Sequence, residues 1–157
     1  MVGLQRTILA EFEHAREVRW SDTCGANEVH FAQWLCYMEE AEYAFLRARG
    51  LSVVLQDCRG MIGFPRLACE LNILGSAACG QMLMTRLTLG HCDGKQLEYR
   101  FGIFRDDQLL AQGRFLVACC RFPTDRPPYA IPIPDWVLQK LPEIVPRVLG
   151  ERGASAP

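Results

Sequence analysis

Residues 31–50 read FAQWLCYMEEAEYAFLRARG, and their apolar side chains recur at the spacing of one helix face. The stretch holds no proline or internal glycine, and Gly50 is a typical helix terminator. The apolar stripe consists of Phe31, Trp34, Leu35, Met38, Ala41, Phe45 and Leu46. This pattern predicts one long helix over about residues 31–49, with a face broad enough to be wrapped by a sheet.

Strand-like segments lie on both sides of this helix. Residues 11–20 alternate between a face with Phe12 and Val18 and a more polar face, which predicts an entering strand. Short turns separate the later segments, so we expect an antiparallel meander. Its four strands are expected at residues 66–74, 82–89, 97–104 and 109–122. On the first of these, the residues predicted to share the apolar face are Leu67, Cys69, Leu71 and Ile73.

The segments between and after these strands are expected to be irregular. Residues 51–65 are predicted to be a connector, and the proline-rich residues 123–134 cannot join a central strand. Asp135 is a candidate cap for a short helix that runs to about Gly150. The predicted fold class is α+β, with an antiparallel sheet of about five strands wrapped around one long helix and a short C-terminal helix.

The composition fits a single globular domain. The chain has 157 residues, of which 50% are hydrophobic and 22% charged, enough apolar material to bury a core. We therefore expect one domain over residues 1–157, with its core at about 10–122 and a proline-rich extension at 123–157. The formal net charge of −1 gives no reason to expect a nucleic-acid partner.

Targeting signals and metal motifs are not evident in the sequence. No stretch is long and apolar enough for a signal peptide or a membrane helix, so we expect a cytoplasmic protein without a membrane partner. The 8 cysteines include no C-x-x-C pair and only 3 histidines accompany them, so we predict no metal site. Most of the cysteines are expected to be reduced and buried as small hydrophobes.

The segment before the helix, residues 18–31, reads VRWSDTCGANEVHF. With the order of one strand, one helix and four strands, it resembles the hotdog-fold acyl thioesterases of the 4-hydroxybenzoyl-CoA thioesterase and YbgC group. Asp22 matches the first Asp of that family's D-x-D motif, and Cys24 stands where the second Asp would be. Val29, His30 and Phe31 match the apolar–aromatic–aromatic step into the helix. The resemblance covers about residues 10–122.

This resemblance implies a hotdog fold and hydrolysis of an acyl thioester to a free acid and a thiol. CoA or phosphopantetheine would enter as part of the substrate, and no separate cofactor is implied. Hotdog thioesterases join their sheets edge to edge with the site between subunits, which implies a homo-oligomer, either a dimer or a dimer of dimers (a homotetramer). A carrier-protein thioesterase of a polyketide pathway, with an acyl carrier protein as partner, is one alternative. A non-catalytic acyl-thioester-binding hotdog protein is another, favoured by the missing Asp.

The resemblance also implies roles for residues of the loop and the helix start. The backbone N–H of Phe31 would stabilise the oxyanion that forms on the thioester carbonyl. The family's second Asp is its nucleophile or general base, and Cys24 in its place leaves three readings open. Cys24 could attack as a thiolate, Glu28 could act as a base, or a positioned water could suffice, as in the related thioesterases of enediyne pathways. Asp22 is also a catalytic candidate, although its expected role is to hold the turn by accepting backbone N–H bonds.

Substrate contacts are predicted around the same loop and at two cations. The cations would bind phosphates of the thiol carrier, because guanidinium groups pair well with phosphate oxygens. The predicted substrate-binding residues are Asn27, Val29, His30, Trp34, Met38, Arg66 and Arg86.

Overall fold

The computed structural model describes residues 8–142 of the chain. The end of the predicted C-terminal helix and residues 143–157 of the predicted extension lie outside these residues. In chain order the elements are β1 (Ala10–Glu17), the 3-10 turn η1 (Trp20–Asp22), α1 (Phe31–Ala48), β2 (Val54–Asp57), β3 (Gly60–Gly63), β4 (Arg66–Ile73), β5 (Met82–Cys92), β6 (Gln96–Arg105), β7 (Gln108–Ala118), β8 (Cys120–Phe122), β9 (Tyr129–Ala130) and α2 (Asp135–Leu138).

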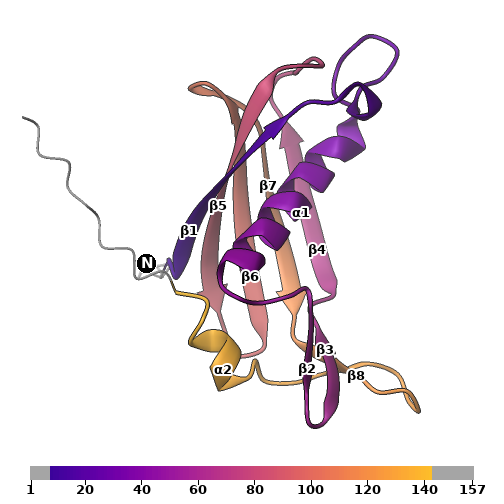
Figure 1. Cartoon of the computed structure of the whole chain (residues 1–157), viewed down its shortest axis with the longest axis vertical. Coiled ribbons are helices and arrows are strands. Elements are labelled where there is room, and N and C mark those ends of the chain that lie inside the picture. The colour runs from indigo at the N-terminus through magenta and orange to yellow at the C-terminus, as the bar shows by residue number, and fades with distance from the viewer. Residues whose placement is uncertain (1–7, 143–157) are drawn as a thin grey trace, which may run out of the picture.

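The main sheet is antiparallel and has the strand order β1-β5-β6-β7-β4. It curves around α1, which lies against one face of the sheet (Figure 1). The predicted α+β class and the predicted long helix are therefore confirmed. On β6 the apolar alternation is also confirmed, because Leu97, Tyr99, Phe101 and Ile103 are all buried toward the helix.

Aromatic packing and one glycine set the distance between α1 and the sheet. The Phe45 ring meets Phe12 of β1 and Tyr99 of β6 edge to face, with centroids 5.9 and 6.4 Å apart. Met38 lies directly over Gly113 of β7, where an added Cβ would stand 2.8 Å from its sulfur. Any side chain at Gly113 would therefore clash with Met38 and, at 2.5 Å, with the backbone carbonyl of Glu70 on β4.

β4 is an edge strand whose inward side chains remain partly uncovered. Cys69, Leu71 and Ile73 pair with residues of β7 that face the helix, so the predicted shared face is right for these three. Leu67 instead lies where the register shifts between Arg66 and Ala68. Because this edge is not fully covered, Ile73 is 46% exposed, Leu67 is 53% exposed and Cys69 is also exposed.

The predicted connector at residues 51–65 is wrong, because it contains the hairpin β2–β3. This hairpin joins β8 and β9 in a second sheet of order β2-β3-β8-β9 (Figure 1). Arg121 of β8 donates to both carboxylate oxygens of Asp57, at 2.7 and 2.8 Å, and fixes the hairpin. The proline-rich segment adds only the two-residue strand β9 at the edge of that sheet, which agrees with its exclusion from a central strand.

Two smaller predictions are corrected. α2 begins after Pro134 as the N-cap, and Asp135 lies in its first turn rather than capping it. Five of the cysteines are exposed, against the prediction that most are buried: Cys24, Cys36, Cys58, Cys69 and Cys79. They lie in loops, at a turn and on the uncovered flanks of α1 and β4, where periodicity gives no measure of burial.

No helix within residues 8–142 is long and apolar enough to cross a membrane.

Candidate active site

The loop between η1 and α1 folds into a small closed turn. The amide of Cys24 donates to the carbonyl of Glu28 at 2.8 Å, and the amide of Asn27 donates to the carbonyl of Cys24 at 2.9 Å. Asn27 has a positive φ of 58°, a conformation that Asn tolerates better than most residues. The turn leaves the side chains of Cys24 and Glu28 exposed to solvent.

A second loop, residues 75–81, holds this turn in place. The amide of Val29 donates to the carbonyl of Ala77 at 2.9 Å, and the amide of Cys79 donates to Oδ1 of Asn27 at 3.3 Å. Val29 is buried. The buried Val29 side chain offers little surface to a substrate, against the prediction. Asn27 is exposed and uses its Oδ1 to hold the second loop, and its predicted contact with substrate stays a prediction.

Asp22 is buried beneath the turn, and its Oδ1 accepts from the Ser21 hydroxyl at 3.5 Å. Its Oδ2 accepts from the amide of Arg19 at 2.9 Å, from Nη2 of Arg16 at 2.7 Å and from the hydroxyl of Tyr37 at 3.1 Å. Burial alone would raise the pKa of Asp22, but these donors hold it below its ordinary value. Burial and the Asp22 carboxylate also raise the pKa of Tyr37.

These contacts give Asp22 a positioning role. It ties the loop both to β1 through Arg16 and to α1 through Tyr37, and its acceptance of a backbone N–H agrees with the expected turn-holding role. A carboxylate that is buried and surrounded by three donors does not reach a substrate. The buried position of Asp22 therefore argues against the predicted catalytic role.

The start of α1 presents one free backbone donor. Nδ1 of His30, the N-cap residue, accepts from the amide of Ala32 at 3.3 Å. The amide of Phe31 has no acceptor within the part of the chain that the structure describes. It points out of the positive end of an 18-residue helix, so it can stabilise a developing negative charge.

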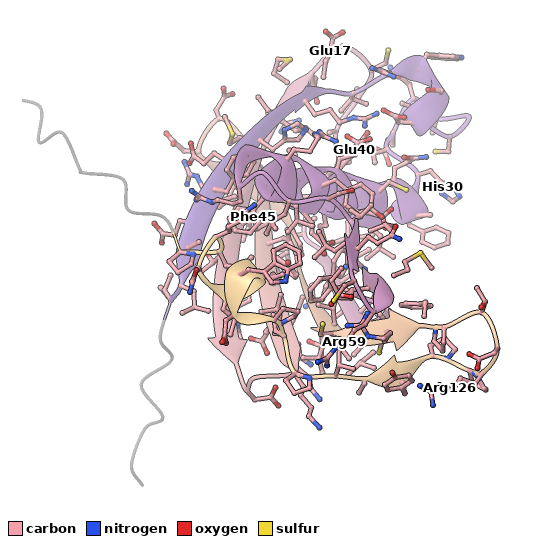
Figure 2. The ribbon with its side chains drawn as sticks, turned by 60° about the horizontal axis from the view of Figure 1, so that its bottom comes forward. Glu17, His30, Glu40, Phe45, Arg59 and Arg126 are labelled. Atoms are coloured by element: carbon pink, nitrogen blue, oxygen red, sulfur yellow. The ribbon has the colours of Figure 1, made fainter. Side chains whose placement is uncertain are left out.

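The rings of His30 and Phe31 lie beside this donor. Their centroids are 4.6 Å apart, and the Phe31 side chain is 64% exposed. Figure 2 shows His30 at the end of α1 where the helix begins. A substrate carbonyl at the Phe31 amide would therefore approach between exposed aromatic surface and the Cys24–Glu28 turn.

Two other predicted substrate contacts belong to the core. Trp34 is 1% exposed and Met38 is fully buried. Trp34 packs edge to face against Tyr37 at 6.0 Å, and Met38 packs on Gly113. Their assignment to a substrate pocket is corrected, since neither offers surface to a ligand.

The two predicted phosphate-binding cations lie on opposite faces of the sheet and do not converge. Arg66 faces α1, where it forms ion pairs with Glu39 and Glu42. Arg86 is on the outer face, where its Nε donates to Glu13 of β1 at 2.9 Å. β4 and β5 are separated by β6 and β7 in the sheet, so these two arginines do not form one phosphate site within a single subunit.

The buried pair of Glu42 and Arg66 was missed by the sequence analysis. Glu42 is 2% exposed and accepts from Nη1 of Arg66 at 2.8 Å. Burial raises the pKa of Glu42, which the Arg66 charge opposes. The burial of Glu42 could have been predicted from its position on the helix, because Glu42 falls beside Met38 and Phe45 on the apolar stripe.

The sequence of the chain is similar to those of known CoA hydrolases. No family model matches the chain. A 1,4-dihydroxy-2-naphthoyl-CoA hydrolase from Synechocystis is 27% identical over 117 residues, which is 73% of this chain and 85% of the relative. A counterpart from Synechococcus elongatus is 28% identical over 135 residues, 82% of this chain and 96% of the relative.

Solved structures agree with the sequence relatives. The crystal structure of a 1,4-dihydroxy-2-naphthoyl-CoA thioesterase from Synechocystis superposes with a TM-score of 0.72 at 23% identity, over 84% of this chain and 96% of that one. A 4-hydroxybenzoyl-CoA thioesterase mutant complexed with 4-hydroxybenzoyl-CoA gives 0.71 at 13% identity, over 83% and 98%. The chain has the hotdog fold of these thioesterases. In this hotdog domain the long helix is α1, and its exposed start lies at the Cys24–Glu28 turn.

Proposed function

We propose that the chain hydrolyses an acyl-CoA thioester to a free acid and CoA. The observation that carries this proposal is the free backbone N–H of Phe31 at the start of α1. The names of the curated relatives, CoA hydrolases acting on an aromatic acyl group, support the same reaction. The shared hotdog fold supports it as well, although a fold by itself does not determine chemistry.

The reaction needs a donor for the oxyanion and a group that attacks the carbonyl carbon. In the proposed step a water oxygen adds to the carbonyl carbon and loses its proton, and the carbonyl oxygen becomes an oxyanion bound by the Phe31 N–H. When the C–O double bond re-forms, the C–S bond breaks, and the thiolate leaves and takes up the proton that the water has lost. Loss of one oxyanion donor in other enzymes costs about 10²–10³ in rate, so this group can supply a substantial part of the catalysis.

Two side chains of the turn remain candidates for assisting the attack. Cys24 and Glu28 are both exposed beside the helix start. The Cys24 sulfur makes no hydrogen bond among the described residues, so no described base is positioned on its proton. We therefore propose direct attack by water rather than an acyl group held on Cys24.

We also propose that two copies pair through β4. This strand is the edge of the main sheet, and its inward side carries the exposed Ile73 and Cys69 next to Leu67. Edge pairing would cover both the open backbone groups and this apolar surface. Light scattering should give the mass of two chains, and Ile73→Asp should lower it, whereas Asn72→Asp on the outer face of the same strand should not. An equal mass for all three proteins would rule out this interface.

Thiol release from aromatic and aliphatic acyl-CoAs tests the enzymatic proposal, with 1,4-dihydroxy-2-naphthoyl-CoA and 4-hydroxybenzoyl-CoA in the panel. We expect turnover by the natural sequence, little change in Cys24→Ala and faster turnover in Cys24→Asp. An acyl adduct on Cys24, together with lost turnover in Cys24→Ala, would replace water attack by a covalent step. Absence of turnover on every CoA ester would contradict the proposal, and hydrolysis of acyl carrier protein esters would then identify the carrier-protein alternative.

A further inference from the structure

One arginine of the main sheet holds both ends of the second loop, residues 75–81. Nη1 of Arg105 donates to Oε1 of Gln81 at 3.0 Å and to the carbonyl of Ser76 at 3.3 Å. Arg105 is the last residue of β6. Figure 1 shows the second loop, the turn between β6 and β7 and the start of α1 at the same end of the molecule.

The side chain of Gln81 extends this hold into the middle of the loop. Its Oε1, which accepts from Arg105, also accepts from the amide of Ala78 at 3.0 Å. The backbone of the loop pairs separately with Val18, which follows β1. The amide of Val18 donates to the carbonyl of Gln81 at 2.9 Å, and the amide of Gly80 donates to the carbonyl of Val18 at 2.8 Å. The Arg105 bonds therefore fix the part of the loop that β1 does not hold.

That part of the loop is the one that contacts the start of α1. The carbonyl of Ala77 accepts from the amide of Val29 at 2.9 Å, and the amide of Cys79 donates to Oδ1 of Asn27 at 3.3 Å. Val29 lies two residues before Phe31, whose N–H is the proposed oxyanion donor. A continuous series of hydrogen bonds therefore connects the end of β6 with the segment that aims this donor.

The electrostatics of Arg105 favour this role. Arg105 has no carboxylate at ion-pair distance within residues 8–142, so its guanidinium is used on uncharged oxygens. Hydrogen bonds from a charged donor are stronger than those between neutral groups, and the guanidinium fork fixes their directions. Nη2 makes a third bond, to Oε1 of Gln108 across the turn between β6 and β7, at 2.8 Å. This third bond does not involve the second loop.

We propose that Arg105 is a positioning residue for the hydrolysis, which holds the Phe31 N–H in place through Gln81 and the second loop. The inference rests on the proposed function and adds to it a residue that does not touch the substrate. An oxyanion donor must lie about 2.7–3.1 Å from the atom that becomes charged. Because a shift of about 1 Å at a reacting group lowers the rate about 10²-fold, a loosened loop should be visible in kcat.

Steady-state kinetics on an acyl-CoA that the natural sequence hydrolyses test the assignment. Arg105→Met, which removes the donors and keeps a long side chain, should lower kcat about tenfold. KM should stay unchanged, because the loss concerns the transition state and not substrate binding. Gln81→Met should lower kcat similarly, whereas Gln81→Glu keeps an acceptor oxygen and should retain most of kcat. The double variant Arg105→Met/Gln81→Met should be little slower than Arg105→Met alone, because both changes break the same connection.

Gln108→Met provides the matched control. It removes the one bond of Arg105 that does not reach the second loop, so kcat and KM should both remain those of the natural sequence. An equal fall of kcat in Gln108→Met and Arg105→Met would overturn the assignment, since the turn between β6 and β7 would then be responsible. An unchanged kcat in Arg105→Met, or a raised KM alone, would overturn it as well.

Amide hydrogen exchange tests the same connection without turnover. The Val29 amide should exchange faster in Arg105→Met and Gln81→Met than in Gln108→Met, while the amides of the β2–β3 hairpin exchange equally in all of them. Faster exchange throughout the chain would show a general loss of stability and would overturn the assignment. If the chain hydrolyses no thioester but the Val29 amide responds in this way, the connection from Arg105 to the helix start stands while the proposed hydrolysis fails. If the chain hydrolyses thioesters and neither kcat nor the Val29 amide responds, the hydrolysis stands and the role of Arg105 fails.

Discussion

The β1 flank and the β4 flank of α1 each bury one carboxylate, and the two carboxylates are stabilised in different ways. On the β1 flank Asp22 accepts from an amide, a guanidinium and a phenol, and its pKa is lowered despite burial. On the β4 flank Glu42 has Arg66 as its partner and Glu39 as a nearby like charge, and burial raises its pKa. Glu42 lies deeper and has fewer donors than Asp22, and both differences favour the protonated form of Glu42.

The largest effect should come from removing the Asp22 carboxylate. Asp22→Ala leaves Arg16 and Tyr37 without their shared acceptor, and breaking a buried charged pair costs about 3–5 kcal/mol. Chemical denaturation should show a loss of that size in the free energy of unfolding. Because the same carboxylate holds the loop at Phe31, kcat should fall as well. Glu13→Ala, which breaks the exposed pair with Arg86, should cost less than about 1 kcal/mol.

The pH dependence of stability should follow from the same carboxylate. The pKa of Asp22 is lower in the folded chain than its ordinary value of 3.8, so the unfolded state binds more protons. Its contribution is therefore fully present above the ordinary pKa and is lost as pH falls through the lower folded pKa. The difference in unfolding free energy between the natural sequence and Asp22→Asn should shrink across that acid range. A constant difference from pH 7 down to pH 2 would show that Asp22 is not held in the charged form.

A smaller effect is expected for the phenol. Tyr37→Phe removes one of the three donors to Asp22 and leaves the ring and the cation–π contact with Arg16 in place. The expected loss is about 1 kcal/mol, the net value of a typical hydrogen bond. Urea denaturation of this variant beside Asp22→Ala would test whether the three donors act together. A loss as large as that of Asp22→Ala would mean that the phenol alone fixes the loop.

The elements that the sequence predicted are those with strong local signals. The apolar stripe of α1 spans many residues, and the alternation on β6 is regular, so both were found. The hairpin β2–β3 was missed because its strands are four residues each, and it is fixed by a bond between Asp57 and Arg121, 64 residues apart. The local sequence pattern around Asp57 does not indicate a partner that lies so far along the chain.

In the candidate site, too, the features with a local signal were predicted and those that depend on distant residues were not. The helix start at Phe31 and the turn-holding bond of Asp22 follow from neighbouring residues and were predicted. The bond between the Cys79 amide and Asn27 was not predicted, because the two residues lie 52 positions apart in the chain. The positions of Arg66 and Arg86 depend on strand register across the sheet, which composition and spacing do not fix.

Replacing Glu42 should change the free energy of unfolding least. The direction of the accompanying pH dependence distinguishes the β4 flank from the β1 flank. Because the pKa of Glu42 is raised above its ordinary value of 4.5 in the folded chain, the folded state binds more protons than the unfolded state. Its contribution is present below the ordinary pKa and is lost as pH rises through the folded pKa. Glu42→Gln keeps the size and an acceptor for Arg66, whose charge retains Glu39 as a partner.

The free energy of unfolding at pH 7 should therefore change by less than about 1 kcal/mol in Glu42→Gln. Denaturation between pH 4 and pH 8 should show Glu42→Gln gaining on the natural sequence as pH rises, the reverse of the trend for Asp22→Asn as pH falls. A loss of several kcal/mol at pH 7 would instead show that the charge of Glu42 stabilises the fold. Both buried carboxylates would then stabilise the fold in their charged form.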